Sequence, residues 1–202
     1  MKKILVTYAT LSGTTAEVAQ AVGEEIAKSG MQADVLPLAS VKELDSYDGV
    51  LLGAPMIAGW HRSALTFVSK HRKSWTRVPL AFFATAMSLT QTTTTSLDGV
   101  PLCIDDALPK PPQKPDQLTF RERYARAENY ARPMLNAARP AKPVSIALFG
   151  GRLEYGRLPW WAVVFAMFII QAPAGDKHNW SFIRSWAAGI PQAFERAAVS
   201  SH

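Results

Sequence analysis

The chain has a single cysteine, Cys103, among its 202 residues. An intramolecular disulfide is therefore excluded, and nothing indicates an oxidising compartment. The four histidines and Cys103 do not show the sequence spacing that is typical of metal ligands. No metal site is predicted.

Long apolar runs are also missing. Residues 158–170 (LPWWAVVFAMFII) carry no charge, but they are too few for a membrane-spanning helix, which needs about 20 apolar residues. We expect either a buried core helix or a hydrophobic face that contacts a membrane or a second copy in a homo-oligomer. Residues 1–3 lead directly into a short strand-like run, without the apolar segment of a secretory signal. The predicted location is therefore cytoplasmic, with peripheral contact to the inner face of the membrane as an option.

Acidic residues are outnumbered, 16 against 22 basic ones, which gives a formal net charge of +6. A basic surface attracts anionic partners, such as nucleic acid, phospholipid or carboxylated substrates. No nucleic-acid partner is predicted from the motifs described below. Hydrophobic residues make up 48% of the chain and charged residues 19%, a balance typical of a folded globular protein. The length suits one domain over residues 1–202.

Short apolar, β-branched runs alternate with amphipathic segments. Predicted strands are 4–8, 33–38, 49–54, 78–84 and 144–149, and predicted helices include 15–28, the region around 64–68, and 181–198. Repeated β-loop-α units indicate an α/β fold, a doubly wound parallel sheet with helices on both faces. Pro37 cannot donate a ladder hydrogen bond, so the second strand is placed at a sheet edge.

Residues 88–143 interrupt this alternation. They begin with a threonine run, continue through four prolines between 109 and 115, and end in a helical pattern over 120–138. We interpret them as a long insertion between the fourth and fifth strands. Within the insertion, residues 110–142 carry eight basic residues and three acidic ones. This segment is therefore either a solvated face or a surface that binds a partner.

Residues 10–15 (TLSGTT) stand between the first strand and the first helix. A helix start presents unpaired backbone N–H groups and a positive dipole end, which together bind phosphate. Gly13 permits a close approach because it has no Cβ, and Thr10, Ser12, Thr14 and Thr15 supply hydroxyl donors. The alternative is that these residues only cap the helix. The loop has no lysine, no Walker spacing and no GxGxxG, which argues against a nucleoside triphosphate or a dinucleotide.

The TLSGTT segment resembles the phosphate loop of flavodoxins, [ST]-x-[ST]-G-x-T. Residues 53–61 and 85–89 stand where flavodoxins place the two loops that line the flavin ring. The resemblance implies a five-stranded sheet of order 2-1-3-4-5 and FMN as cofactor. Its implied contacts are Thr10, Leu11, Ser12, Gly13, Thr14, Thr15, Pro55, Met56, Ile57, Ala58, Gly59, Trp60, Ala86, Met87, Ser88 and Leu89.

Finer features resemble the menaquinone-dependent protoporphyrinogen dehydrogenases. Residues 53–61 are similar to their GAS…GxxH loop, 129–132 (NYAR) to an SYAR segment, and 150–155 to a G-x-L-x-Y run before an apolar helix. This resemblance implies oxidation of protoporphyrinogen IX, or a similar anionic apolar substrate, with electrons passed to a quinone. Candidate carboxylate contacts are Arg62, Arg152 and Arg157, because guanidinium pairs bidentately with carboxylates.

No catalytic base is assigned, although His61 is a candidate proton shuttle. A flavodoxin-type electron carrier, an NAD(P)H:quinone reductase and a scaffold without cofactor remain alternatives. The basic balance favours an enzyme, because positive charge stabilises the anionic reduced flavin and raises its potential, although salt screens distant charges.

Overall fold

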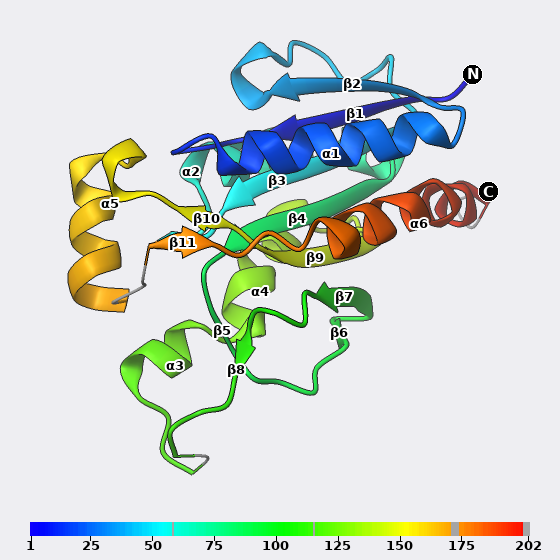
Figure 1. Cartoon of the computed structure of the whole chain (residues 1–202). Coiled ribbons are helices and arrows are strands. Elements are labelled where there is room, and N and C mark those ends of the chain that lie inside the picture. Colours follow the sequence, from blue (N-terminus) through cyan, green and yellow to red (C-terminus); the bar gives the residue numbers. More distant parts are fainter. Residues whose placement is uncertain (58, 115, 171–173, 200–202) are drawn as a thin grey trace.

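The apolar runs of the sequence form the strands of one sheet in the computed structural model, which describes residues 1–57, 59–114, 116–170 and 174–199 (Figure 1). The sheet order is β2-β1-β3-β4-β9-β7-β6. Its strands are β1 (Lys3–Tyr8), β2 (Gln32–Pro37), β3 (Gly49–Pro55), β4 (Leu80–Ala86), β6 (Ser96–Leu97), β7 (Val100–Ile104) and β9 (Ser145–Gly150).

The five predicted strands lie in the predicted order, with β9 as the fifth, and all pair in parallel. Their observed bounds differ from the predicted ones by at most two residues; β4, for example, begins at Leu80 rather than Val78. Strand β2 lies at the edge, as Pro37 indicated.

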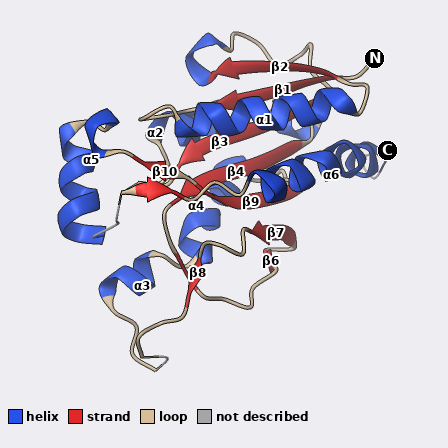
Figure 2. Cartoon of the chain, viewed as in Figure 1, coloured by secondary structure: helices blue, strands red, loops and turns tan. Residues whose placement is uncertain are grey.

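Helices cover both faces of this sheet (Figure 2). Helices α1 (Thr14–Lys28) and α6 (Trp180–Val199) pack on one face, and α2 (Arg62–Lys70) and α4 (Ala127–Ala138) on the other. Adjacent strand residues point to opposite faces, so Phe82 packs with α2 and α4 while Phe83 packs with α1 and α6, both fully buried. Both strands are buried along their whole length, which explains why β3 and β4 are apolar except at Thr85.

The insertion adds strands to the sheet. It contributes β7, which pairs with β9, and β6, which pairs antiparallel with β7. The predicted five-stranded parallel core is confirmed, and the insertion extends the sheet beyond β9 by two strands. The expected helix over 120–138 is also divided, into α3 (Phe120–Tyr124) and α4, with Ala125 and Arg126 between them. Short strands β5 (Leu89–Thr90) and β8 (Pro109–Lys110) pair with each other.

Asp105 joins the insertion to the rest of the fold. Its carboxylate is fully buried and accepts hydrogen bonds from the backbone of Gly150 at 3.2 Å, from the amide of Asn179 at 3.1 Å and from Ala107 at 3.0 Å. Buried carboxylates need such partners, and these three fix the end of β7 against β9 and the start of α6.

Residues 158–170 project from the carboxyl ends of the strands, away from the two packed faces (Figure 1). They form α5 (Trp160–Val164) and a π-helix, η4 (Phe165–Ile170); β10 (Arg152–Leu153) and β11 (Gly175–Asp176) pair beside them. Single 3₁₀ turns occupy Leu38–Ser40 (η1), Ser74–Thr76 (η2) and Tyr155–Arg157 (η3).

The expectation of a buried core helix over 158–170 is wrong. The side chains of Ala162 and Ala166 are buried, but the large apolar side chains around them are 41–79% exposed: Trp160, Trp161, Val164, Met167 and Phe168. Within the described residues, no helix has the length and apolar character needed to cross a bilayer.

Candidate functional site

The loop between β1 and α1 has the geometry of an anion site. Gly13 has φ +93°, in the left-handed region, and a Cβ there would have no neighbour within 4 Å. Its N–H donates to the Thr10 hydroxyl at 2.9 Å, and its carbonyl accepts the first helical hydrogen bonds of α1. The backbone N–H groups of Thr14 and Thr15 have no acceptor among the described residues. Two donors at a positive helix end therefore face the open side of the loop.

Most hydroxyls of this loop are already engaged. Thr14 donates to the carbonyl of Arg152 at 3.1 Å and lies 3.3 Å from the Ser12 hydroxyl, and the Thr15 hydroxyl pairs with Thr85 at 3.0 Å. These contacts join the loop to β4 and β10. The backbone is therefore the main free donor, and the hydroxyls hold it in place.

The loop after β3 lies beside it. Ala9 donates to Gly53, and Met56 donates to Thr85, each at 2.9 Å. Gly59 also has a positive φ of +97°. Ala58, which was predicted to contact the cofactor, lies outside the described residues.

The loop after β4 completes the group. Gly151 donates to Ala86 at 2.9 Å, Tyr130 donates its hydroxyl to Ser88 at 3.0 Å, and the Lys177 ammonium donates to the Met87 carbonyl at 2.8 Å. The three predicted segments thus meet at the carboxyl ends of parallel strands, where open α/β sheets bind ligands.

Comparison with known proteins decides the family. A family model described as a flavodoxin domain matches residues 5–179. The chain belongs to the flavodoxin family.

One relative of this flavodoxin-family chain is an enzyme whose name states its reaction. The chain is 25% identical over 177 residues to the protoporphyrinogen IX dehydrogenase [quinone] of Escherichia coli (strain K12), covering 86% of this chain and 82% of that protein. Solved structures show the same fold. A short-chain flavodoxin associated with a bacterial microcompartment has TM-score 0.52 at 10% identity, covering 98% of this chain and 99% of that one. A flavodoxin from the domain Archaea has TM-score 0.51 at 13% identity, covering 96% and 99%. Family membership supports a redox function.

Several predicted cofactor contacts of this flavodoxin-family chain lie in the core. Trp60 is only 5% exposed, its indole N–H donates to the Tyr130 carbonyl, and its ring meets Phe82 edge-on. Leu89 is 1% exposed and Ala86 3%. Packing therefore accounts for these side chains, and their contact with a cofactor stays a prediction.

A cavity of about 500 Å³ opens beside the loop after β3. Its lining joins predicted cofactor residues to α5: Leu11, Pro55, Ile57, Trp60, His61, Arg62 and Trp161. The His61 ring lies 2.8 Å from the Ser63 hydroxyl, and which of the two atoms donates depends on the tautomer. The cavity thus has apolar walls with one imidazole and one guanidinium.

The three predicted carboxylate contacts differ in their partners. Arg152 pairs with Glu17 and, at 2.8 Å, with Glu154, and the Glu17 hydrogen bond raises the pKa of its guanidinium. Arg157 pairs with Glu154 at 2.6 Å. Arg62 is exposed and has no carboxylate partner in the described part of the chain. Of these three arginines, Arg62 alone can bind a substrate carboxylate without giving up an ion pair.

Tyr124, from the insertion, was missed by sequence reasoning. A small cavity between the two ring-lining loops is bordered by Ile57, Met87, Tyr124 and Phe165. The Tyr124 hydroxyl is buried beside Gly59 without reaching hydrogen-bond geometry with any described residue, and burial raises its pKa. Nothing in the local sequence marks this tyrosine, because its position depends on how the insertion folds back.

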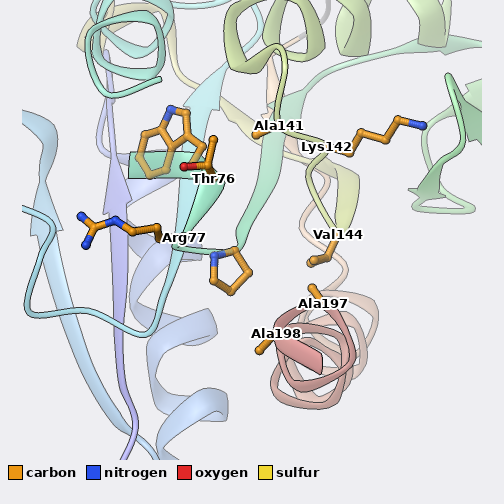
Figure 3. Close-up of a pocket in the computed structure, with 9 residues that line it drawn as sticks. Thr76, Arg77, Ala141, Lys142, Val144, Ala197 and Ala198 are labelled. Carbon is orange, nitrogen blue, oxygen red and sulfur yellow. The ribbon is translucent and has the colours of Figure 1, made fainter. Parts of the chain in front are cut away.

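A third cavity, of about 430 Å³, lies at the opposite, amino ends of β4 and β9 (Figure 3). Its two cations, Arg77 and Lys142, point away from each other in Figure 3, and Arg77 pairs with Asp45 at 3.0 Å. No predicted site residue lines it.

Proposed function

We propose that this chain is an FMN-dependent oxidoreductase that passes electrons from an apolar, anionic donor to a quinone. The observation that carries the proposal is the meeting of three segments. A helix start with two free N–H groups lies beside two loops that can flank a flat ring.

The phosphate loop and the two ring-lining loops offer groups that match the two parts of FMN, its phosphate and its ring. The phosphate suits the N–H groups of Thr14 and Thr15, with the open space over Gly13 allowing close approach. The ring suits the loops that carry Ile57 and Met87, whose side chains are half-buried. No ammonium or guanidinium lies within residues 10–15, so backbone dipoles must provide most of the anion binding.

FMN, when bound, supplies a ring that takes up an electron pair and releases it to a second substrate. In each turnover the donor loses two electrons and two protons, and the quinone gains both to become a quinol. The chain's own residues have to position both partners and exclude water. The cavity lined by Trp161 and Arg62 provides an apolar wall and a carboxylate contact at its rim. His61, in the same cavity, is the candidate to hold or pass a proton.

The named relative supports protoporphyrinogen IX as donor. That molecule combines an apolar macrocycle with carboxylates, which matches the cavity chemistry. Arg62 is the first candidate for a carboxylate contact, whereas Arg152 and Arg157 would have to exchange ion pairs with Glu17 and Glu154. An electron-carrier role is the second candidate, because the structural neighbours of similar size are flavodoxins.

Residues 158–170 support a peripheral contact with an anionic lipid surface. Two exposed tryptophans and three further exposed apolar side chains lie on α5 and η4, and Arg157, 58% exposed, precedes them. Aromatic and apolar residues beside cations are typical of helices that lie in the membrane interface. A quinone dissolved in the bilayer would then reach the cavity at Trp161. Sedimentation with anionic vesicles tests this contact, and loss of binding in Phe168→Glu is expected; unchanged sedimentation, or dimerisation through the same face, would contradict it.

The function itself is tested by reconstitution followed by anaerobic turnover. The purified chain is expected to bind FMN and turn yellow, and protoporphyrinogen IX is expected to bleach it until a quinone restores the colour. Bleaching by NADPH instead would identify a quinone reductase. Bleaching only by a protein electron donor would identify a carrier. A folded chain that refuses FMN would refute the proposal.

A further inference from the structure

Lys177 is a cation fixed against the loop that follows β4. Its ammonium donates to the carbonyl of Met87 at 2.8 Å. Met87 is one of the residues predicted to line the flavin ring, and it remains half-buried. The positive charge therefore lies at the proposed ring site, although Lys177 is distant from this loop in sequence.

The backbone around Lys177 holds it there. Its N–H donates to the carbonyl of Gly151 at 3.0 Å, and its own carbonyl lies against Gly150, where a Cβ would be only 1.9 Å from the oxygen. Gly151 in turn donates to Ala86 at 2.9 Å. Two glycines thus allow the segment of Lys177 to pack directly on the end of β9 and on the loop after β4.

The charge of Lys177 is not balanced locally. No carboxylate pairs with it within the described ranges; Asp176, its neighbour, turns to the His178 ring at 2.7 Å. The pKa of Lys177 is lowered, first by burial and then by the positive charge of Lys110. Lys110 lies on β8, which pairs with β5 in the continuation of the same loop. A partly desolvated cation without a counter-ion, beside a second cation, creates a site that favours an anion.

We propose that Lys177, assisted by Lys110, raises the reduction potential of bound FMN by stabilising the negative charge that reduction places on the ring. The inference rests on the proposed function and adds the residue that adapts the fold to accepting electrons from a substrate. In a titration, dithionite supplies two electrons and solvent supplies one proton, so the reduced ring carries one more negative charge than the oxidised ring. A cation nearby favours that form, in the manner in which charges around a cofactor tune its electronics.

The test is a potentiometric titration of FMN-loaded protein with three substitutions at one position. Lys177→Gln keeps a hydrogen-bond donor but removes the charge, Lys177→Met removes both, and Lys177→Arg keeps both. We expect Gln and Met to weaken binding of reduced FMN relative to oxidised FMN by about tenfold, which corresponds to about 30 mV for a two-electron couple, and Arg to stay near wild type. Lys70→Gln, an exposed lysine at the far end of α2, controls for the loss of net charge and should leave the potential unchanged.

A wild-type potential in Lys177→Gln would overturn the inference, because it would show that removing the charge leaves the potential unchanged. If the Lys177 variants fail to hold FMN, Lys110→Gln carries the test: its potential should fall in the same direction by a smaller amount, and an unchanged value overturns the inference. A wild-type protein that does not bind FMN would instead refute the proposed function. A yellow protein whose variants keep their potential refutes only the role of Lys177.

Discussion

Replacing Gly150 with alanine should damage the site from behind. The new Cβ would lie 1.9 Å from the carbonyl oxygen and 2.8 Å from the carbonyl carbon of Lys177. Both contacts are with backbone, so no side chain can rotate away. The Lys177 segment must retreat by about 1.5 Å to reach an ordinary contact distance, in an interior packed as densely as a crystal.

The cost can be estimated from two effects. Overpacking of a tight interior costs about 1–3 kcal/mol, and loss of the hydrogen bond from Lys177 to Gly151 adds about 1 kcal/mol. We therefore expect the free energy of unfolding to fall by about 3 kcal/mol, and FMN affinity to fall as the ammonium withdraws from Met87. Urea denaturation followed by circular dichroism measures the first effect, and fluorescence titration with FMN the second.

Gly156→Ala is the matched control. A Cβ at Gly156 meets nothing within 4 Å, and its φ is not positive, so the stability should change by no more than about 0.5 kcal/mol. If Gly150→Ala were as stable as this control, the packing of the Lys177 segment described above would be wrong.

Three further substitutions test the rest of the fold. Gly189→Ala, within α6 and with open space at its Cβ, should stabilise by about 1 kcal/mol through helix propensity; a decrease in the denaturation midpoint would contradict this. Asp105→Asn should cost about 1–3 kcal/mol, because a buried acceptor of three hydrogen bonds becomes partly a donor; wild-type stability would show that the insertion is anchored elsewhere. Asp34 has its pKa lowered chiefly by the hydrogen bond from Lys3, so its carboxylate stabilises the fold above its ordinary pKa of 3.8, and this contribution is lost as the pH falls through the lowered value. Asp34→Asn should therefore cost about 1 kcal/mol at pH 7 and converge with wild type in acid unfolding; a constant difference down to pH 2 would contradict the ion pair.

Local patterns were sufficient to predict the parallel sheet. Four of the five predicted strands, β1, β3, β4 and β9, are buried on both faces, which leaves an apolar run that is hard to mistake. The predicted start of the helical pattern at residue 120 agrees with α3, whose first turn is stabilised by a capping box between Thr119 and Glu122. Gly13 followed from the resemblance of its loop, and its positive φ agrees with that interpretation.

Features that depend on contacts between distant parts of the chain could not be predicted from the sequence. Strand β7 contains Pro101, which precedes the residues that pair with β9, and this pairing joins residues more than 40 positions apart. Residues 158–170 look like core in composition, yet the sheet had no free face left for them after α1, α2, α4 and α6 were placed. Lys177 and Tyr124 reach the site only through the folding of later segments. Gly150-Gly151 was the one local signal, since adjacent glycines mark a close backbone approach.

We propose that the backbone of residues 10–15 binds the phosphate of FMN. Comparing the affinities of FMN and riboflavin for the purified protein tests it most directly, because the two ligands differ only in that phosphate. Charge-assisted hydrogen bonds contribute about 1.5–3 kcal/mol each, so two of them predict that FMN binds at least about 100-fold more tightly. Equal affinities for the two ligands would contradict the account.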